Sequence, residues 1–226
     1  MLDTELKKEI NEILSSTNKD FKLWFRCDDI AVASKKFVKM NSIFKKYDTK
    51  CYYAVIPNLI EDSVIKEINS NPNIFVMQHG ISHKNNGTNV ALELIDNKHI
   101  IDECIEKITF MKDAFGNKFN NILCPPWNKI EQGAEKILSN FYDGLSTYFC
   151  NESCFKFDLN PNIDIIDWTT GNYKGHKFIV EKMKARLYTN YIGFCLHHNH
   201  MNDDAFDFIE YIVSNFNDKI NLSFRI

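Results

Sequence analysis

The sequence has 226 residues, of which 44% are hydrophobic and 25% are charged, the proportions of an ordinary globular protein. Its formal net charge of −3 leaves no surplus of positive charge for a phosphate backbone, so we expect no nucleic-acid partner. No apolar stretch approaches the roughly 20 residues that a membrane-spanning helix needs, and an integral membrane protein is therefore not expected.

The N-terminal segment, residues 1–10, has neither the basic start nor the apolar run of a secretory signal. The seven cysteines are an odd number without paired spacing, which argues against a disulfide framework. Together these features predict a cytoplasmic protein. Because no repeat and no Pro/Gly/Ser-rich linker interrupts the sequence, we expect residues 1–226 to form a single domain.

After a helix expected at residues 3–15, short β-branched or aromatic runs alternate with longer stretches of helical period. The predicted strands are residues 21–27, 51–56, 73–78, 121–124, 144–149, 163–167, 191–197 and 220–225. The predicted helices between them are residues 31–47, 61–70, 97–115, 131–140, 176–189 and 203–216. This alternation predicts an α/β fold with a parallel sheet, either a barrel or an open doubly wound sheet. In both, the active site forms at the C-terminal ends of the strands.

The first predicted strand ends in two adjacent carboxylates, Asp28 and Asp29. Neighbouring side chains diverge on a strand, so one carboxylate could bind a metal while the other faces the substrate as a base. The alternative is that one of them caps the following helix.

The third predicted strand is followed by two histidines that are four residues apart, His79 and His83. In a helical turn this spacing places two imidazoles on one side, where both can bind one cation. An Asp from another strand would complete a set of two histidines and one carboxylate, with positions left for water. The alternative is a pair of unrelated loop histidines.

Later strand ends also carry polar or aromatic side chains. Cys124 to Trp127 contains two prolines that stiffen the backbone before an aromatic side chain, although a turn with a buried Trp has the same pattern. The segment Asp164 to Trp168 places further carboxylates beside an aromatic. Three histidines, His197, His198 and His200, lie at or just after the end of the strand predicted at residues 191–197, and solvated loop histidines are the alternative there.

In this order, the segments resemble those of the NodB-type polysaccharide deacetylases, carbohydrate esterase family four. The resemblance extends from about residue 24 to residue 208 and covers five motifs. The resemblance implies a distorted (β/α)7 barrel, which agrees with the number of predicted strands. It also implies a divalent metal ion, expected to be Zn²⁺, and an N-acetylated sugar or sugar conjugate as the partner.

The resemblance implies a role for each motif. Asp28 is the catalytic base, the metal ligands are Asp29, His79 and His83, and the fifth motif, residues 196–199, supplies a histidine that protonates the departing amine. Asp167 is expected to hold that imidazole. The side chains expected to contact the sugar are Pro126, Trp127 and Trp168, and the two tryptophans offer faces for stacking on a pyranose ring.

Two positions depart from the family pattern. Cys124 stands where the family usually has an Arg that orients the base. Arg26 is a candidate substitute, because residues 26 and 28 project to the same side of one strand. In the fifth motif, one alignment selects His198 as the acid and another selects His197, and the sequence leaves both open.

The sequence therefore predicts a metal-dependent hydrolase that removes an N-acetyl group from an amino sugar. Because the Arg of the third motif is absent, an inactive carbohydrate-binding homologue is the first alternative. The second is an amidohydrolase on the same fold that acts on a non-sugar C–N bond. A cytoplasmic location favours a small or conjugated sugar over a wall polymer as the substrate.

Overall fold

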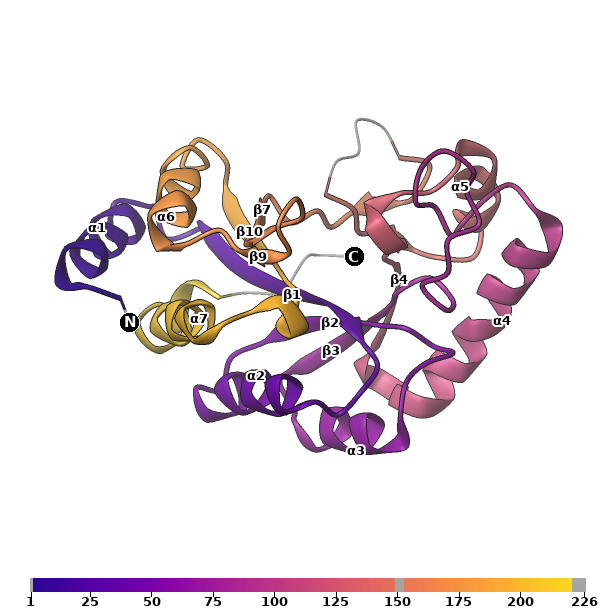
Figure 1. Ribbon diagram of the computed structural model, residues 1–226, viewed down its shortest axis with the longest axis horizontal. Coiled ribbons are helices and arrows are strands. Elements are labelled where there is room, and N and C mark those ends of the chain that lie inside the picture. Colours follow the sequence, from indigo (N-terminus) through magenta and orange to yellow (C-terminus); the bar gives the residue numbers. More distant parts are fainter. Residues whose placement is uncertain (1, 149–152, 221–226) are drawn as a thin grey trace. The chain divides into compact units, whose positions relative to one another are not determined.

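The computed structural model describes residues 2–148 and 153–220 (Figure 1). This part of the chain divides into two compact units. Unit 1 comprises the chain through Cys27, Ser34–Cys51 and the residues from Pro161 onward, and unit 2 comprises Asp28–Ala33 and Tyr52–Asn160. The strand β1 (Lys22–Ile30) contributes its first six residues to unit 1 and its last three to unit 2.

Unit 1 contains parallel strands with helices. β1 pairs with β10 (Tyr191–Leu196) in a register that runs from Lys22 opposite Tyr191 to Cys27 opposite Leu196, and β10 pairs with β7 (Ile163–Asp164). A small antiparallel pair is formed by β8 (Ile166–Asp167) and β9 (Asn172–Tyr173). The helices of this unit are α1 (Thr4–Ser15), α2 (Lys35–Lys46), α6 (His176–Lys184) and α7 (Asp203–Asn215).

Unit 2 continues the parallel pattern. Its strands follow the hydrogen-bonded order β6-β5-β4-β3-β2-β1, and the last three residues of β1 belong to this unit. They are β2 (Cys51–Val55), β3 (Ile74–Gln78), β4 (Phe119–Leu123), β5 (Gly144–Leu145) and β6 (Phe157–Asp158), and Cys51 itself belongs to unit 1. The helices are α3 (Asp62–Ser70), α4 (Lys98–Phe115) and α5 (Gln132–Leu138), of which α4 lies beside β3 and β4 and contacts α5 (Figure 1).

Local sequence accounts for the longer helices. Asn97 caps α4 by accepting the His99 N–H at 3.0 Å, which satisfies a donor that the helix itself cannot pair. One face of α4 buries Ile101, Cys104 and Ile108 in a core cluster that includes Ile81 and Leu94. These two residues belong to the loop between β3 and α4, so this loop is anchored in the core of unit 2.

The predicted α/β class with parallel strands is confirmed, and every predicted helix that lies between strands is present with shorter ends. The first predicted strand, residues 21–27, continues to Ile30 and so includes both acids. The predicted strand 163–167 is split at Ile165, and the predicted strand 144–149 is reduced to two residues. Residue 149 and residues 221–225 of the last predicted strand lie outside the described residues.

The longest described helix, α4, carries charged residues throughout its length. Among the residues that the structure describes, no helix combines the length and the apolar character needed to cross a bilayer.

Candidate metal centre

The end of β1 presents the two adjacent carboxylates in different environments. Asp28 is buried, with 1% of its surface exposed, whereas the Asp29 side chain is 28% exposed. The backbone of Asp29 has a φ of 61°, in the left-handed region that a residue with a Cβ rarely adopts. Such strain costs of order 1–3 kcal/mol and persists where the surrounding structure imposes it, often at functional sites.

The end of β3 fixes the first histidine. The N–H of His79 donates to the carbonyl oxygen of Val55 on β2 at 2.7 Å, which holds its backbone in the sheet. Its ring atom Nδ1 lies 2.8 Å from the carbonyl oxygen of Cys124, directly after β4. A carbonyl oxygen only accepts hydrogen bonds, so Nδ1 carries the proton and the ring presents Nε2 as its donor atom for a metal.

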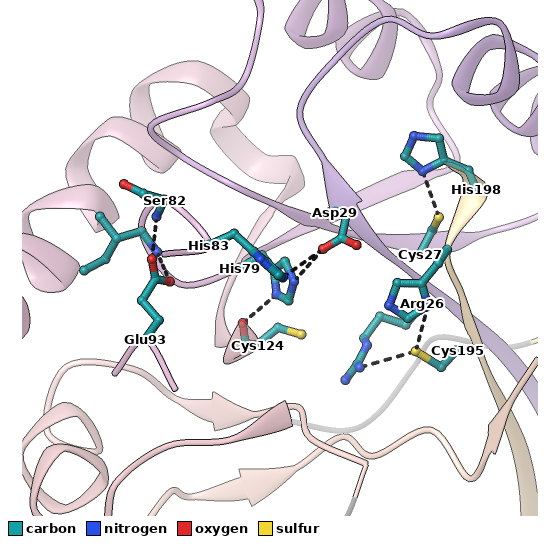
Figure 2. Close-up of polar contacts among 12 residues, drawn as sticks. Arg26, Cys27, Asp29, His79, Ser82, His83, Glu93, Cys124, Cys195 and His198 are labelled. Carbon is teal, nitrogen blue, oxygen red and sulfur yellow. Dashed lines mark hydrogen bonds and ion pairs between the residues drawn. The ribbon is translucent and has the colours of Figure 1, made fainter. Parts of the chain in front are cut away.

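The structure brings Asp29, His79 and His83 together (Figure 2). Oδ1 of Asp29 lies 3.2 Å from Nε2 of His79 and 3.2 Å from Nε2 of His83. One potential ligand atom from each of the three residues lies within 4.8 Å of the others. All three belong to unit 2.

The donor set fits a divalent cation of the zinc type. Two imidazole nitrogens and one carboxylate oxygen are ligands that zinc prefers, and the set leaves coordination positions for water and substrate. Burial by itself lowers the pKa of His79, but the neighbouring Cys124 and Asp29 offset that effect and hold this pKa well above its ordinary value, with a further contribution from the charge of Asp28. The surroundings of His79 therefore favour positive charge.

His83 is the second residue of the set with a left-handed backbone, at a φ of 55°. Its ring meets the ring of Trp127 edge to face, with centroids 4.4 Å apart. Trp127 is partly exposed and follows the buried Pro126, and its own φ of 54° turns the chain after β4. Trp127 therefore forms a wall beside a metal-ligand candidate instead of filling the core.

Glu93 was not singled out from the sequence, although it is 1% exposed and touches the same loop. Its carboxylate accepts three backbone N–H bonds, from Ile81, Ser82 and Lys84. The available signal is weak: Glu93 is the one charged residue within the apolar run from Val90 to Ile95.

The two candidate acids of unit 1 have different neighbours. His197 is 6% exposed, and the Trp168 ring meets it edge to face at 4.5 Å. His198 is 1% exposed, with Nδ1 3.6 Å from the Cys27 thiol and its ring at the Phe37 ring of α2, 6.0 Å between centroids. His198 is thus packed toward a helix, and His197 lies against an aromatic side chain that is 53% exposed.

The fourth motif is arranged around Asp164. Its two carboxylate oxygens accept from the Trp168 indole N–H at 2.8 Å and from the Ile166 N–H at 2.9 Å. The Asp167 carboxylate instead accepts the Thr169 N–H at 2.9 Å, and this bond lowers the pKa of Asp167. That Asp167 holds a catalytic imidazole stays a prediction.

Arg26 is fully buried in β1, and its guanidinium reaches the Cys195 thiol at 3.5 Å (Figure 2). Burying a guanidinium costs free energy unless hydrogen-bond acceptors surround it. The contact with Cys195 is one that holds the Arg26 side chain within unit 1. That Arg26 orients Asp28 in place of the third-motif Arg stays a prediction.

Comparison with solved structures identifies the fold. The chain is similar to the polysaccharide deacetylase Bc1974 from Bacillus cereus, with a TM-score of 0.57 and 16% identity over 88% of each chain. It is also similar to the peptidoglycan N-acetylglucosamine deacetylase Bc1960, with a TM-score of 0.56 and 14% identity over 88% of this chain and 85% of the other. A third similar structure is BA3943, described as a CE4 family pseudoenzyme from Bacillus anthracis, with a TM-score of 0.57 and 13% identity over 85% and 59% of the two chains.

No protein-family model matches the sequence, and no curated protein is significantly similar to it. At such low identities the structural similarity shows the fold alone. The chain therefore has the α/β fold of the CE4 polysaccharide deacetylases, the distorted (β/α)7 barrel type that the motifs predicted.

Proposed function

We propose that this chain is a metal-dependent hydrolase that removes the N-acetyl group from an amino sugar or a sugar conjugate. The observation that carries the proposal is the position of Asp29 Oδ1, 3.2 Å from Nε2 of both His79 and His83. Three side chains of two ligand types suited to zinc, two imidazoles and one carboxylate, meet near the ends of β1 and β3 in a fold whose solved relatives include deacetylases.

Asp29, His79 and His83 would hold the cation, for which we propose Zn²⁺. When bound, such an ion polarises the acetyl carbonyl and lowers the pKa of a bound water toward neutrality. The hydrogen bond from His79 Nδ1 to the Cys124 carbonyl keeps Nε2 directed to the site, the arrangement that fixes the tautomer of metal-binding histidines.

We assign the role of general base to Asp28. Asp28 is adjacent to Asp29 but far more buried. Fewer water molecules therefore surround the carboxylate that must accept the proton. Asp28 takes a proton from the water that attacks the amide carbon, and a histidine of the fifth motif gives a proton to the departing amine. We assign this second role to His197, because its ring lies against the exposed Trp168.

The exposed indole of Trp168 and the partly exposed Trp127, which follows Pro126, are the surfaces we propose for contact with a sugar ring. The hydrogen bond from the Trp168 indole to Asp164 fixes the orientation of that ring. If the protein is cytoplasmic, as its sequence predicts, a small or conjugated N-acetyl sugar is a more accessible substrate than a wall polymer.

Cys124 favours one alternative, a homologue that binds sugars without turnover. The family pattern has a base-orienting Arg at this position, and the structurally similar BA3943 is itself described as a pseudoenzyme. Such a protein could keep the metal ligands and still lack acetate release.

The test combines metal analysis with acetate release from a panel of N-acetyl hexosamine conjugates, for the wild type and His83→Ala. We expect stoichiometric zinc and acetate release from the wild type, and loss of both from the variant. A variant that keeps stoichiometric zinc would refute the ligand set. Sugar binding without acetate release by the zinc-loaded wild type would identify the pseudoenzyme, and hydrolysis of non-sugar amides alone would identify the amidohydrolase.

A further inference from the structure

We propose that Glu93 is a positioning residue whose buried carboxylate holds the turn Gly80–Lys84 in the conformation that brings His83 to the metal centre. The inference rests on the proposed function, because it assigns His83 to a metal. It goes beyond that proposal, because Glu93 belongs to none of the five motifs and lies ten residues after His83.

The contacts of Glu93 converge on the backbone around His83. Oε2 accepts the N–H of Ile81 at 2.9 Å, and Oε1 accepts the N–H groups of Ser82 and Lys84, each at 2.9 Å. Figure 2 shows the bond between Glu93 and Ser82. Hydrogen bonds to an ionised carboxylate are stronger than neutral ones, and more so where water is excluded. One side chain thus fixes peptide groups on both sides of His83.

His83 needs this support because its backbone is strained. Its φ of 55° lies in the left-handed region, and a residue with a Cβ keeps that conformation only where its surroundings impose it. Ser82 and Lys84 are the immediate neighbours of His83, so their bonds to one carboxylate restrict rotation before and after it. The direction of the imidazole toward Asp29, 3.2 Å away, follows from that restriction.

Glu93 is itself anchored in the core of unit 2. The next residue, Leu94, is fully buried in the same hydrophobic cluster as Ile81. The backbone carbonyl of Glu93 accepts the side-chain amide of Asn86 at 2.9 Å, and the carbonyl of Leu94 accepts the N–H of Glu131 at 2.9 Å. The backbone of Glu93 is therefore fixed in position. From there its carboxylate can hold the strained turn Gly80–Lys84 through hydrogen bonds.

Gly80 complements this carboxylate. A Cβ placed on Gly80 would lie 2.0 Å from Glu93 Oε2 and 2.6 Å from Cδ of Pro126, closer than side-chain atoms approach. The absence of a side chain at Gly80 is what admits the carboxylate to the turn. Since both oxygens of Glu93 accept backbone N–H groups, its role is to position His83 and not to bind the metal.

The test compares four proteins prepared without metal: the wild type, Glu93→Gln, His83→Ala and the matched control Glu135→Gln. Among the described residues, the Glu135 carboxylate accepts one backbone N–H, from Cys154 at 2.9 Å, and so provides the same chemical change at another carboxylate of unit 2. Gln keeps one acceptor oxygen but turns an NH₂ group toward a backbone donor. Co²⁺ is titrated into each protein with absorption spectra recorded, and amide hydrogen exchange is measured before metal is added.

We expect Glu93→Gln to bind Co²⁺ about 10–100-fold more weakly, the range typical when a residue that orients a ligand is lost. At a fixed Co²⁺ concentration its absorption should lie between that of the wild type and that of His83→Ala, and the amides of Ile81, Ser82 and Lys84 should exchange faster than in the wild type. Glu135→Gln should match the wild type in both measurements. A Glu93→Gln protein with wild-type affinity, spectrum and exchange would overturn the inference.

Two further outcomes keep the inference separate from the proposed function. If the wild type binds no Co²⁺, the metal centre is refuted, and with it the role of Glu93 toward His83, although amide protection would still report the contacts. If Glu93→Gln does not fold, the metal-free wild type decides the matter: the three amides must exchange on the order of 100-fold more slowly than in an unstructured peptide. Unprotected amides there would overturn the inference.

Discussion

Nδ1 of His79 lies 2.8 Å from the backbone carbonyl oxygen of Cys124. The sequence departs from the family pattern at Cys124, yet the contact that orients His79 comes from the main chain and does not depend on the side chain there. A Cys at the position where the family pattern has an Arg therefore leaves the orientation of this metal-ligand candidate intact. Any loss that it causes should affect the proposed base, Asp28, instead.

Replacement of Cys124 by Ala should accordingly preserve metal binding. We expect the metal affinity to stay within about threefold of the wild type, while loss of the buried thiol lowers the free energy of unfolding by about 1 kcal/mol. Metal titration and denaturant unfolding measure the two quantities. His79→Ala is the comparison, and it should lose the metal. Loss of metal from Cys124→Ala would show that the thiol itself binds the ion.

Substitutions at Asp28 and Asp29 should differ in their effects on turnover and on metal content. Asp28→Asn should keep the metal and cut turnover by about 10²–10⁴-fold, the range typical of general-base loss. Asp29→Asn should lose the metal, because Asp29 Oδ1 faces both imidazoles. Metal analysis and acetate release on the same samples provide the comparison. Equal loss of both quantities in Asp28→Asn would make Asp28 a ligand or a structural cap.

Gly80→Ala tests how tightly the turn before His83 is packed. Gly80 and Gly116 both have positive φ values, 57° and 54°, but an added Cβ meets Glu93 at 2.0 Å in the first case and nothing within 4 Å in the second. Gly116→Ala should cost about 1–3 kcal/mol of backbone strain. Gly80→Ala should cost about 1–3 kcal/mol more from overpacking and should also weaken metal binding.

Chemical denaturation gives the two free energies of unfolding, and Co²⁺ titration gives the affinities. Gly116→Ala should leave the metal affinity unchanged, because Gly116 follows α4 and belongs to no part of the candidate centre. Equal destabilisation by the two substitutions, with no effect on metal binding in either, would contradict the close approach of Glu93 to the turn.

The fold could be predicted from the sequence because long amphipathic helices and apolar strands carry a clear period. The ends of elements could not, as β1 shows. Asp28 and Asp29 look like a strand terminus, since charges rarely continue a buried run, but the strand includes both and ends at Ile30. β6 and β9 consist of two residues each, too few to show any period.

Some residues of the candidate site could likewise be predicted from the sequence, and others could not. Asp29, His79 and His83 could be predicted because ligand types recur at strand ends, and the structure brings the three together. Glu93 could not, because a single Glu in a loop has no motif and its function depends on burial. Sequence also could not choose between His197 and His198, since alternation along a strand is broken where the strand ends at Leu196.

The two histidines should now be distinguishable by experiment. His198 is 1% exposed between the Cys27 thiol and the Phe37 ring, so His198→Ala removes a buried ring and should lower the free energy of unfolding by about 2–3 kcal/mol. His197 is also buried, at 6% exposure, but it borders the exposed Trp168 and not a helix, so His197→Ala should cost less, about 1 kcal/mol. Denaturant unfolding measures this difference without reference to activity.

Activity should show the opposite order. If His197 protonates the departing amine, His197→Ala lowers turnover by about 10²–10⁴-fold at unchanged metal content, because general-acid assistance is lost while Asp29, His79 and His83 remain. His198→Ala, assayed at a temperature where it is folded, should keep turnover within about tenfold of the wild type. The reverse order of activities would assign the acid to His198. It would mean that a ring packed against α2 must turn away from Phe37 before the amine can leave.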